Sequence, residues 1–305
     1  MGTPEFAVPS LRALCEHGYE VVGVFTQPDR PSGRGNKVRK SPVKVYAEAA
    51  GIPVFQPEKI RRDGVEDLSR LQPDLCVTAA FGQILSQEIL DIPPMGTVNV
   101  HASLLPRHRG SAPIAWAILQ GDAEIGVTTM LTARGIDNGD MLLKASQVRD
   151  VSLTCGEMTE KLSQIGADLL LSTLREMEAG TLVPEKQKEE DMTYDPMLQK
   201  EMGIIDWTQS GAQVRDRIHG LNPWPACTVP FEGGRLKLLR AQAVEGEGKP
   251  GTVLISDSRE GLVIACGEGA VRILEMQASG GRAMAAKDYL RGHAIDVGTI
   301  LEETE

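Results

Sequence analysis

The first candidates for chemistry are Asn99 and His101, which stand two positions apart at the end of an apolar run. Side chains two apart on a strand share a face, so an amide and an imidazole would converge there. In a parallel α/β sheet, ligands bind beyond the carboxyl ends of the strands, which is where this pair would lie. The pair therefore predicts a polar site. The alternatives are an asparagine that caps a turn and a core histidine whose hydrogen bonds are made within the fold.

A second candidate is the segment 135–140, with the sequence Gly-Ile-Asp-Asn-Gly-Asp, between two strand-like runs. Asp-Asn-Gly is typical of a β-turn, because these residues accept positive φ angles. A turn accounts for Asn138 and Gly139, but it leaves the flanking carboxylates of Asp137 and Asp140 without a reason. The pattern therefore favours a turn and leaves a functional role for the carboxylates open.

A third candidate is the stretch 30–44, which contains six basic residues and no acidic residue: Arg30, Arg34, Lys37, Arg39, Lys40 and Lys44. In a chain with a formal net charge of −10, this is a local reversal of charge. One interpretation is a solvated loop. The other is a phosphate-binding surface, because clustered Lys and Arg release counterions from nucleic acid. Gly33 and Gly35 predict a mobile loop.

Length and composition exclude several classes of protein. The 305 residues favour two domains, and 41% hydrophobic with 24% charged residues is typical of a globular chain. No apolar run approaches the roughly 18–20 residues that span a bilayer, so we expect a cytoplasmic protein without membrane association. The five cysteines are scattered, and no Walker, His-Glu-x-x-His or dinucleotide-binding motif is present. We therefore expect neither a disulfide framework nor a metal site.

Alternating strand and helix patterns across the first two-thirds of the chain predict the elements that would position these residues. The expected strands are 20–25, 75–80, 97–100, 126–131 and 141–148, and the expected helices are 9–17, 42–50, 112–120 and 154–179. Such alternation predicts an α/β fold with a mostly parallel sheet covered on both faces. No strand precedes the turn at Gly2-Thr3-Pro4, so the first strand of this sheet is expected to be absent.

The pattern changes near residue 183. Residues 184–191 are rich in charge and lack an apolar period, which predicts an exposed linker, and Ser210 with Gln213 predicts the start of a short helix. Short β-rich runs follow from residue 228 and favour a small barrel or sandwich. The predicted domains are thus 1–183 and 204–305, joined by a linker at 184–203.

Several of these segments together resemble the 10-formyltetrahydrofolate-dependent formyltransferases. The resemblance rests on Asn99-x-His101-x-Ser103-Leu104-Leu105-Pro106, on Arg109-Gly110, and on Gly126-x-Thr128 followed by Asp137-x-Gly139. It extends to Phe25–Arg30, Gly33-Arg34-Gly35, Ile205-Asp206-Trp207, Gly220–Pro225 and Leu290–His293. It implies a Rossmann-like formyltransferase domain followed by an OB-like domain that helps to hold tRNA. His219 stands where arginine is common in this family.

The resemblance also implies roles for individual residues. The catalytic residues would be Asn99, His101 and Asp137; the folate-binding residues would be Ser103, Leu104, Leu105 and Pro106; and the tRNA-binding residues would be Arg30, Arg34, Lys37, Arg39 and Lys40. The implied co-substrate is 10-formyltetrahydrofolate, the acceptor is the amino group of initiator methionyl-tRNA, and the protein would be a monomer without a metal.

The residues also indicate how such an enzyme would act. A neutral amine that attacks a formyl carbon creates an oxyanion, to which Asn99 and His101 would donate hydrogen bonds. Asp137 would hold His101 or a water molecule that carries the proton. Two alternatives stay open: a formyltransferase acting on a small amine, such as a nucleotide-sugar or purine intermediate, and an inactive RNA- or folate-binding relative. The C-terminal third and the basic stretch favour tRNA, because a small substrate needs neither.

Overall fold

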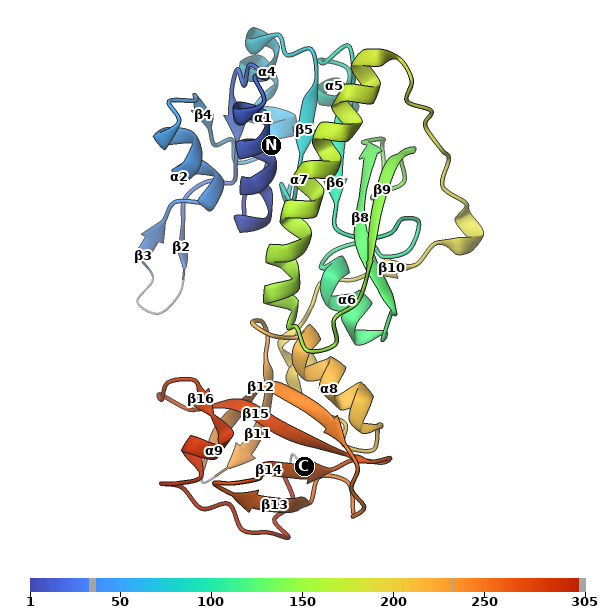
Figure 1. Cartoon of the computed structure of the whole chain (residues 1–305). Coiled ribbons are helices and arrows are strands. Elements are labelled where there is room, and N and C mark those ends of the chain that lie inside the picture. The colour runs from blue at the N-terminus through green and yellow to red at the C-terminus, as the bar shows by residue number, and fades with distance from the viewer. Residues whose placement is uncertain (33–36, 232, 302–305) are drawn as a thin grey trace. The chain divides into compact units, whose positions relative to one another are not determined.

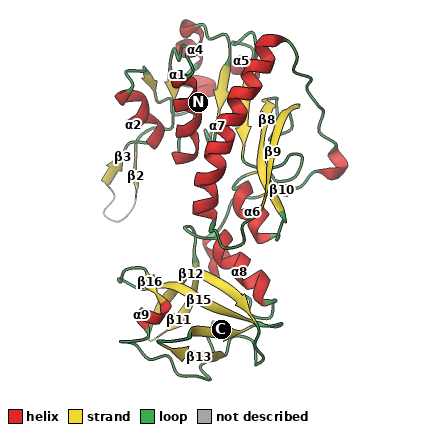
Figure 2. Cartoon of the chain, in the orientation of Figure 1, coloured by secondary structure: helices red, strands yellow, loops and turns green. Residues whose placement is uncertain are grey.

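The computed structural model describes residues 1–32, 37–231 and 233–301 (Figure 1). The chain divides into two compact units. The first unit contains Met1–Gly110, Glu124–Gln147 and Thr159–Asp195, and the second contains Ser111–Ala123, Val148–Met158 and Pro196–Glu305. Figure 2 shows that the first is mixed α/β and the second is dominated by strands, as the sequence predicts. Among the described residues, no helix is long and apolar enough to cross a membrane.

Two groups of strands form the sheet of the first unit. Strands β5 (Cys76–Thr78) and β6 (Thr97–His101) are parallel, and β8 (Glu124–Leu131) pairs with β6 in the antiparallel sense, followed by β9 (Met141–Val148). Strands β1 (Val24–Phe25) and β4 (Val54–Phe55) form a second parallel pair. The carboxyl ends of β5 and β6 therefore lie at one edge, where the sequence places Asn99 and His101.

Met1 and Gly2 lie between these two groups of strands. The Gly2 amide donates to the carbonyl of Phe25 at 3.0 Å, and the Ala79 amide donates to the carbonyl of Met1 at 3.0 Å. These two residues thus occupy the position at which the sequence predicts an absent strand. The strand predicted at 20–25 is observed as β1, which is shorter because the strand it pairs with, β4, has only two residues.

The predicted helices are observed: α1 (Val8–Glu16), α2 (Pro42–Ala49) and α7 (Cys155–Ala179), and, in the second unit, α6 (Pro113–Leu119). The Ser41 hydroxyl caps α2 by accepting from the Lys44 amide at 3.1 Å. Helix α7 approaches the sheet closely at Gly166, where a Cβ would lie 2.9 Å from Val100 Cγ1. The sequence pattern missed β4 and the short helices α3 (Ile60–Asp63), α4 (Val65–Leu71) and α5 (Gln87–Leu90), which are too short to show a period.

The basic stretch includes a hairpin rather than only a loop. Strands β2 (Arg30–Ser32) and β3 (Lys37–Arg39) are antiparallel, with Arg30 opposite Arg39 and Pro31 opposite Val38. We call β2 and β3 the basic hairpin. The prediction that Gly33 and Gly35 make this stretch mobile, and the predicted site residue Arg34, lie outside the described residues.

Antiparallel strands form the sheet of the second unit, in the order β11 (Cys227–Phe231), β12 (Gly234–Val244), β15 (Ala270–Ala278), β14 (Gly261–Ala265) and β13 (Val253–Asp257). β16 (Met284–Ala285) pairs with β15. Helix α8 (Gly211–Gly220) begins at Ser210, whose hydroxyl accepts from the Gln213 amide at 3.3 Å, as predicted. The apolar core of the second unit includes Trp207, Leu221 and Leu262. The predicted β-rich domain is confirmed.

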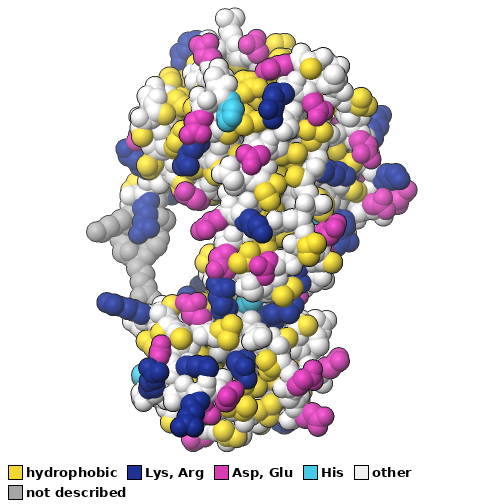
Figure 3. Space-filling view, viewed as in Figure 1, with side chains coloured by type: hydrophobic (Ala, Val, Ile, Leu, Met, Phe, Trp, Pro, Cys, Tyr) yellow, Lys and Arg dark blue, Asp and Glu magenta, His cyan; other side chains and the backbone are white. Residues whose placement is uncertain are grey.

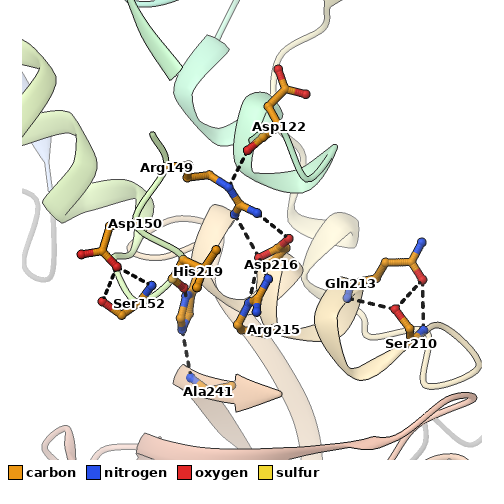
Figure 4. Close-up of polar contacts among 11 residues, drawn as sticks. Asp122, Arg149, Asp150, Ser152, Ser210, Gln213, Arg215, Asp216, His219 and Ala241 are labelled. Carbon is orange, nitrogen blue, oxygen red and sulfur yellow. Dashed lines mark hydrogen bonds and ion pairs between the residues drawn. The ribbon is translucent and has the colours of Figure 1, made fainter. Parts of the chain in front are cut away.

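A buried polar network lies at one side of α8 (Figure 4). Arg149 forms two hydrogen bonds with Asp216, each of 3.0 Å, and donates to the carbonyl of Asp122 at 2.7 Å. His219 donates from Nδ1 to the carbonyl of Val151 at 3.1 Å and accepts at Nε2 from the Ala241 amide at 3.0 Å. Burial lowers the pKa of His219 to about 4. This histidine is therefore a neutral tether between main-chain segments.

Candidate active site

Asn99 lies within β6, opposite Thr78 at the carboxyl end of β5, and is oriented by that neighbouring strand. The Thr78 hydroxyl, on β5, donates to the Asn99 Oδ1 atom at 2.8 Å. Because that hydrogen bond uses the amide oxygen, the groups that Asn99 offers to a ligand are N–H donors. The residue thus has the chemistry required to stabilise a developing negative charge.

His101 is held by main chain at one ring nitrogen and faces a carboxylate at the other. Its Nε2 lies 2.9 Å from the carbonyl oxygen of His108, and because a carbonyl can only accept, Nε2 carries a proton. Its Nδ1 lies 3.7 Å from Asp137 Oδ1. In the neutral ring Nδ1 is an acceptor, and in the imidazolium it is a donor. Nδ1 is therefore the atom at which this ring can gain or release a proton.

Asp137 is both part of a tight turn and part of the site. It has a positive φ of 47°, and its Oδ2 accepts from the Gly110 amide at 2.9 Å. At Gly139 a Cβ would lie 1.8 Å from the carbonyl oxygen of Leu131, so the turn requires glycine at this position. The predicted turn and a functional role for Asp137 are thus compatible, because the turn directs the Asp137 carboxylate towards His101.

The loop Ser103–Pro106 is fixed by some of the residues predicted to bind folate. The Thr128 hydroxyl donates to the Ser103 carbonyl at 2.7 Å and accepts from the Leu105 amide at 3.1 Å. The Ser103 hydroxyl donates to the Arg107 carbonyl at 2.7 Å, and Leu105 packs with Met130 and Met141 in a buried cluster. The side chains of Ser103 and Leu105 therefore hold the loop, while Leu104 and Pro106 are half-buried.

An open cavity of about 480 Å³ lies beyond β1, β4 and β5, and its lining includes Gln27, Arg30, Lys59, Arg61 and Gly82. Arg30 also belongs to the basic hairpin, so the hairpin and the cavity share a cation. The sequence reasoning missed the other lining residues. Their signal was position alone: Gln27 and Gly82 come shortly after strands β1 and β5, where an α/β sheet presents ligands.

Arg30, Arg39 and Lys40, three of the predicted tRNA-binding residues, are exposed on or beside the basic hairpin. Arg30 lies 3.5 Å from Glu58, and Lys40 lies 2.6 Å from Glu48, both in exposed ion pairs. Arg39 is exposed. Figure 3 shows basic and acidic side chains interspersed over the viewed face, as expected for a chain with net charge −10.

The segment predicted as an exposed linker contributes to this site. The Gln187 side-chain amide donates to the carbonyls of Asp137 at 2.7 Å and Gly139 at 2.8 Å, and it accepts from Arg109 Nε at 2.8 Å. The expectation of an exposed linker was wrong for Gln187, which is half-buried. Its charged composition suggested solvent exposure, but a polar side chain can equally bond a turn once the fold brings the two together.

Comparison with known proteins identifies the family. A model of the formyl transferase family matches residues 1–174, and a model of the formyl transferase C-terminal domain matches residues 197–294. The chain belongs to the formyl transferase family. The methionyl-tRNA formyltransferase of Caldanaerobacter subterraneus subsp. tengcongensis is 49% identical over 306 residues, covering 99% of this chain and 98% of the relative. That of Geobacter sulfurreducens is 46% identical, covering 99% and 96%.

Solved structures share the fold at lower identity. HypX from Aquifex aeolicus, in complex with tetrahydrofolic acid, is 22% identical with a TM-score of 0.60, over 84% of this chain and 48% of HypX. The sugar 3N-formyl transferase WlaRD, with dTDP and 5-N-formyl-THF, is 16% identical with a TM-score of 0.67, over 91% of this chain and 94% of that chain. The predicted formyltransferase family and its α/β fold with a smaller β-rich domain are confirmed. Among the described residues, no group of His, Cys, Asp and Glu could hold a metal ion.

Proposed function

We propose that this chain transfers a formyl group from 10-formyltetrahydrofolate to the α-amino group of initiator methionyl-tRNA. The observation that carries this proposal is identity of 46–49% with methionyl-tRNA formyltransferases over 99% of the chain. That coverage includes the basic hairpin and the second unit, neither of which a small amine substrate requires. The site of action would be the cytoplasm, and the enzyme would act as a monomer without membrane association.

Asn99, His101 and Asp137 are the proposed catalytic residues. An α-amino group has a pKa of about 7.7–8.0, and esterification of the carboxyl lowers it further, so the amine can attack without a covalent enzyme intermediate. Asn99 N–H would donate to the oxyanion that forms on the formyl oxygen, and His101 would donate to it from Nδ1 once Nδ1 has taken up a proton. Asp137 would take up the proton released by the amine, with His101 or a water molecule between them, and return it to the departing folate nitrogen.

The loop Ser103–Pro106 is the proposed folate-binding segment. 10-Formyltetrahydrofolate supplies an activated formyl group on a flat, largely apolar molecule. The loop would offer it the half-buried Leu104 and Pro106 as apolar walls, together with main-chain polar groups that fix orientation. Ser103 and Leu105 would act from inside the protein by keeping the loop in place.

The proposed tRNA-binding residues are Arg30, Arg34, Lys37, Arg39 and Lys40, aided by the second unit. Arg30 and Arg39 lie directly opposite each other on neighbouring strands, so both project from the same face of the basic hairpin. The exposed ion pairs of Arg30 with Glu58 and of Lys40 with Glu48 contribute only about 0–1 kcal/mol each, so phosphate groups can replace these two carboxylates. The cavity beside Arg30 would give the acceptor end a route past Lys59 and Arg61.

A direct assay tests the proposal. The purified chain is incubated with 10-formyltetrahydrofolate and initiator methionyl-tRNA, and N-formylmethionine is measured after the ester is hydrolysed. A matched reaction replaces the tRNA with an amino sugar nucleotide or another small amine. Formylation of methionyl-tRNA alone is the expected result. Formylation of the small amine alone would establish the alternative substrate, and no transfer to either would leave the non-enzymatic alternative.

A further inference from the structure

The loop His108–Gly110 contacts both members of the His101–Asp137 pair. The His108 carbonyl accepts from His101 Nε2, and the Gly110 amide donates to Asp137 Oδ2. The position of one short loop thus determines the orientation of the imidazole and of the carboxylate. We propose that Asp195 and His108 are positioning residues that hold this loop, and with it the catalytic pair, in the reactive arrangement. This inference rests on the proposed roles of His101 and Asp137.

The first support is a buried polar pair. His108 Nδ1 donates to Asp195 Oδ2 at 2.8 Å, and the side chains are only 3% and 1% exposed. His108 has a positive φ of 61°, a conformation that non-glycine residues adopt at an energetic cost. A partner that keeps the His108 side chain in place therefore also holds its carbonyl where His101 needs an acceptor.

The second support is main-chain pairing with the same segment. Strand β7 (Arg109–Gly110) pairs in parallel with β10 (Tyr194–Asp195), with Gly110 opposite Asp195. At Gly110 the φ is 109°, and a Cβ would lie 2.5 Å from the Asp195 carbonyl oxygen. Only glycine allows β10 to approach this closely. Asp195 thus acts on the loop through its side chain at His108 and through its main chain at Gly110.

The neighbouring residue Thr193 adds two further contacts. Its hydroxyl accepts from the His108 amide at 2.7 Å, and its carbonyl accepts from the Arg109 amide at 3.0 Å. Arg109 in turn binds Gln187 and Glu189. The segment that contains Gln187, Thr193 and Asp195 therefore holds the loop and the Asp137 turn from one side. Neither Asp195 nor His108 reaches the atoms that would react, so their effect must be on orientation.

The consequence is control over the location of a proton. While the His108 carbonyl accepts from Nε2, the His101 proton stays on Nε2 and Nδ1 is the atom that faces Asp137. Without the carbonyl in place the ring can rotate or carry its proton on Nδ1, and Nδ1 can then no longer take up a proton. Misplacement of a reacting group by about 1 Å can cost on the order of 100-fold in rate.

The test uses two substitutions at Asp195 in the full chain. Asp195→Ala removes the acceptor of His108 Nδ1–H, whereas Asp195→Asn keeps an oxygen that can accept it. We expect Asp195→Ala to lower kcat by about 10- to 100-fold with little change in KM for either substrate, and Asp195→Asn to restore most of the rate. An unchanged kcat in Asp195→Ala would overturn the inference. Thr193→Val, which removes only the hydroxyl contact, keeps the test possible if Asp195→Ala does not fold.

A matched control separates positioning from general stability. Thr173 and Thr129 form a buried hydroxyl pair at 2.7 Å in the same unit. Thr173→Ala should lower the melting temperature and leave kcat unchanged. If Thr173→Ala lowers kcat as much as Asp195→Ala does, the loss reflects stability and the inference fails.

A spectroscopic measurement does not depend on activity. The ¹⁵N shifts of the His101 ring should show a proton on Nε2 in the unsubstituted chain and a mixture of forms in Asp195→Ala. Identical shifts in both would contradict the positioning role. If the unsubstituted chain does not formylate methionyl-tRNA, the proposed function fails, and the ring shifts still decide whether Asp195 positions His101.

Discussion

Two buried histidines, one in each unit, illustrate different uses of the same side chain. His219 in the second unit uses both ring nitrogens on main-chain groups, the Val151 carbonyl and the Ala241 amide (Figure 4). His101 in the first unit uses one nitrogen on a main-chain carbonyl and presents the other to Asp137. Both rings are almost fully buried. Burial therefore does not distinguish a catalytic histidine from a structural one.

The difference lies in whether a ring nitrogen faces a group whose charge can change. A proton added at His219 Nε2 would break the hydrogen bond from the Ala241 amide, and burial already lowers the pKa of this ring to about 4. His101 Nδ1, in contrast, makes no hydrogen bond with the main chain of the described residues that would be broken, and it faces the Asp137 carboxylate at 3.7 Å. The second unit thus uses polar groups to hold main chain together, whereas the first leaves one proton position available for chemistry.

The largest effect is expected from breaking the buried ion pair of the second unit. The side chains of Arg149 and Asp216 are 6% and 7% exposed, so Asp216→Ala leaves an arginine buried without its partner. We expect the free energy of unfolding to fall by about 3–5 kcal/mol. All three tryptophans, Trp116, Trp207 and Trp224, lie in the second unit, so their fluorescence in urea reports on this unit.

The matched control for that measurement is Asp288→Ala, which breaks the exposed pair with Arg291. Its expected cost is about 0–1 kcal/mol. Equal losses in the two variants would mean that burial does not determine the strength of these pairs.

The next effect is on catalysis in the first unit. His101→Ala should lower kcat by about 100- to 1,000-fold, or roughly 2.7–4 kcal/mol, because a donor to the transition state is lost. Folate binding, measured by titration, should change little. The double variant His101→Ala/Asp137→Ala should cost much less than the sum of the two single losses, since the residues act as a unit. Fully additive losses would show that they act independently.

A third expectation concerns the pH dependence of stability. The pKa of His219 is about 4 in the folded chain and about 6.5 when unfolded, so the unfolded chain binds more protons between these values. Stability should therefore fall as the pH decreases from about 6.5 to 4, by about 3 kcal/mol from this group. His219→Gln should be less stable at pH 8 but lose less on acidification. Tryptophan fluorescence in urea at several pH values gives the comparison, and parallel curves would refute it.

The smallest effect is expected at the basic hairpin. Replacing Arg30 and Arg39 by Gln should weaken tRNA binding and reduce the slope of log K against log salt by about 0.7–0.9 for each lost phosphate contact. Adding Arg34→Gln and Lys37→Gln should extend both effects. Arg70→Gln, in an exposed pair with Asp67 on α4, is the control that removes a cation elsewhere. A slope equal to that of the unsubstituted chain would assign these contacts to the second unit.

Local patterns in the sequence predicted much of the fold. Ser41 before Pro42 is a start signal that the sequence shows for α2, and Thr154 with Glu157 is the matching capping-box signal at the start of α7, whose hydrogen bonds the structure shows. These signals are reliable because each depends on hydrogen bonds between residues three apart. The short elements α3, α4, α5 and β4 and the three-residue strands of the basic hairpin escaped because each is too short to show a period in the chain.

For the candidate site, the sequence by itself determined which groups are available: an amide and an imidazole at a strand end, and a carboxylate in a turn that needs glycine. Only the tertiary structure decided which partners these groups have. The contact between Asp195 and His108 spans 87 positions of the chain, and that between Gln187 and Asp137 spans 50. No local pattern encodes such contacts. Asp195 and Gln187 read as residues of a solvated linker, and His219 could be distinguished from His101 only once the partners of each ring nitrogen were known.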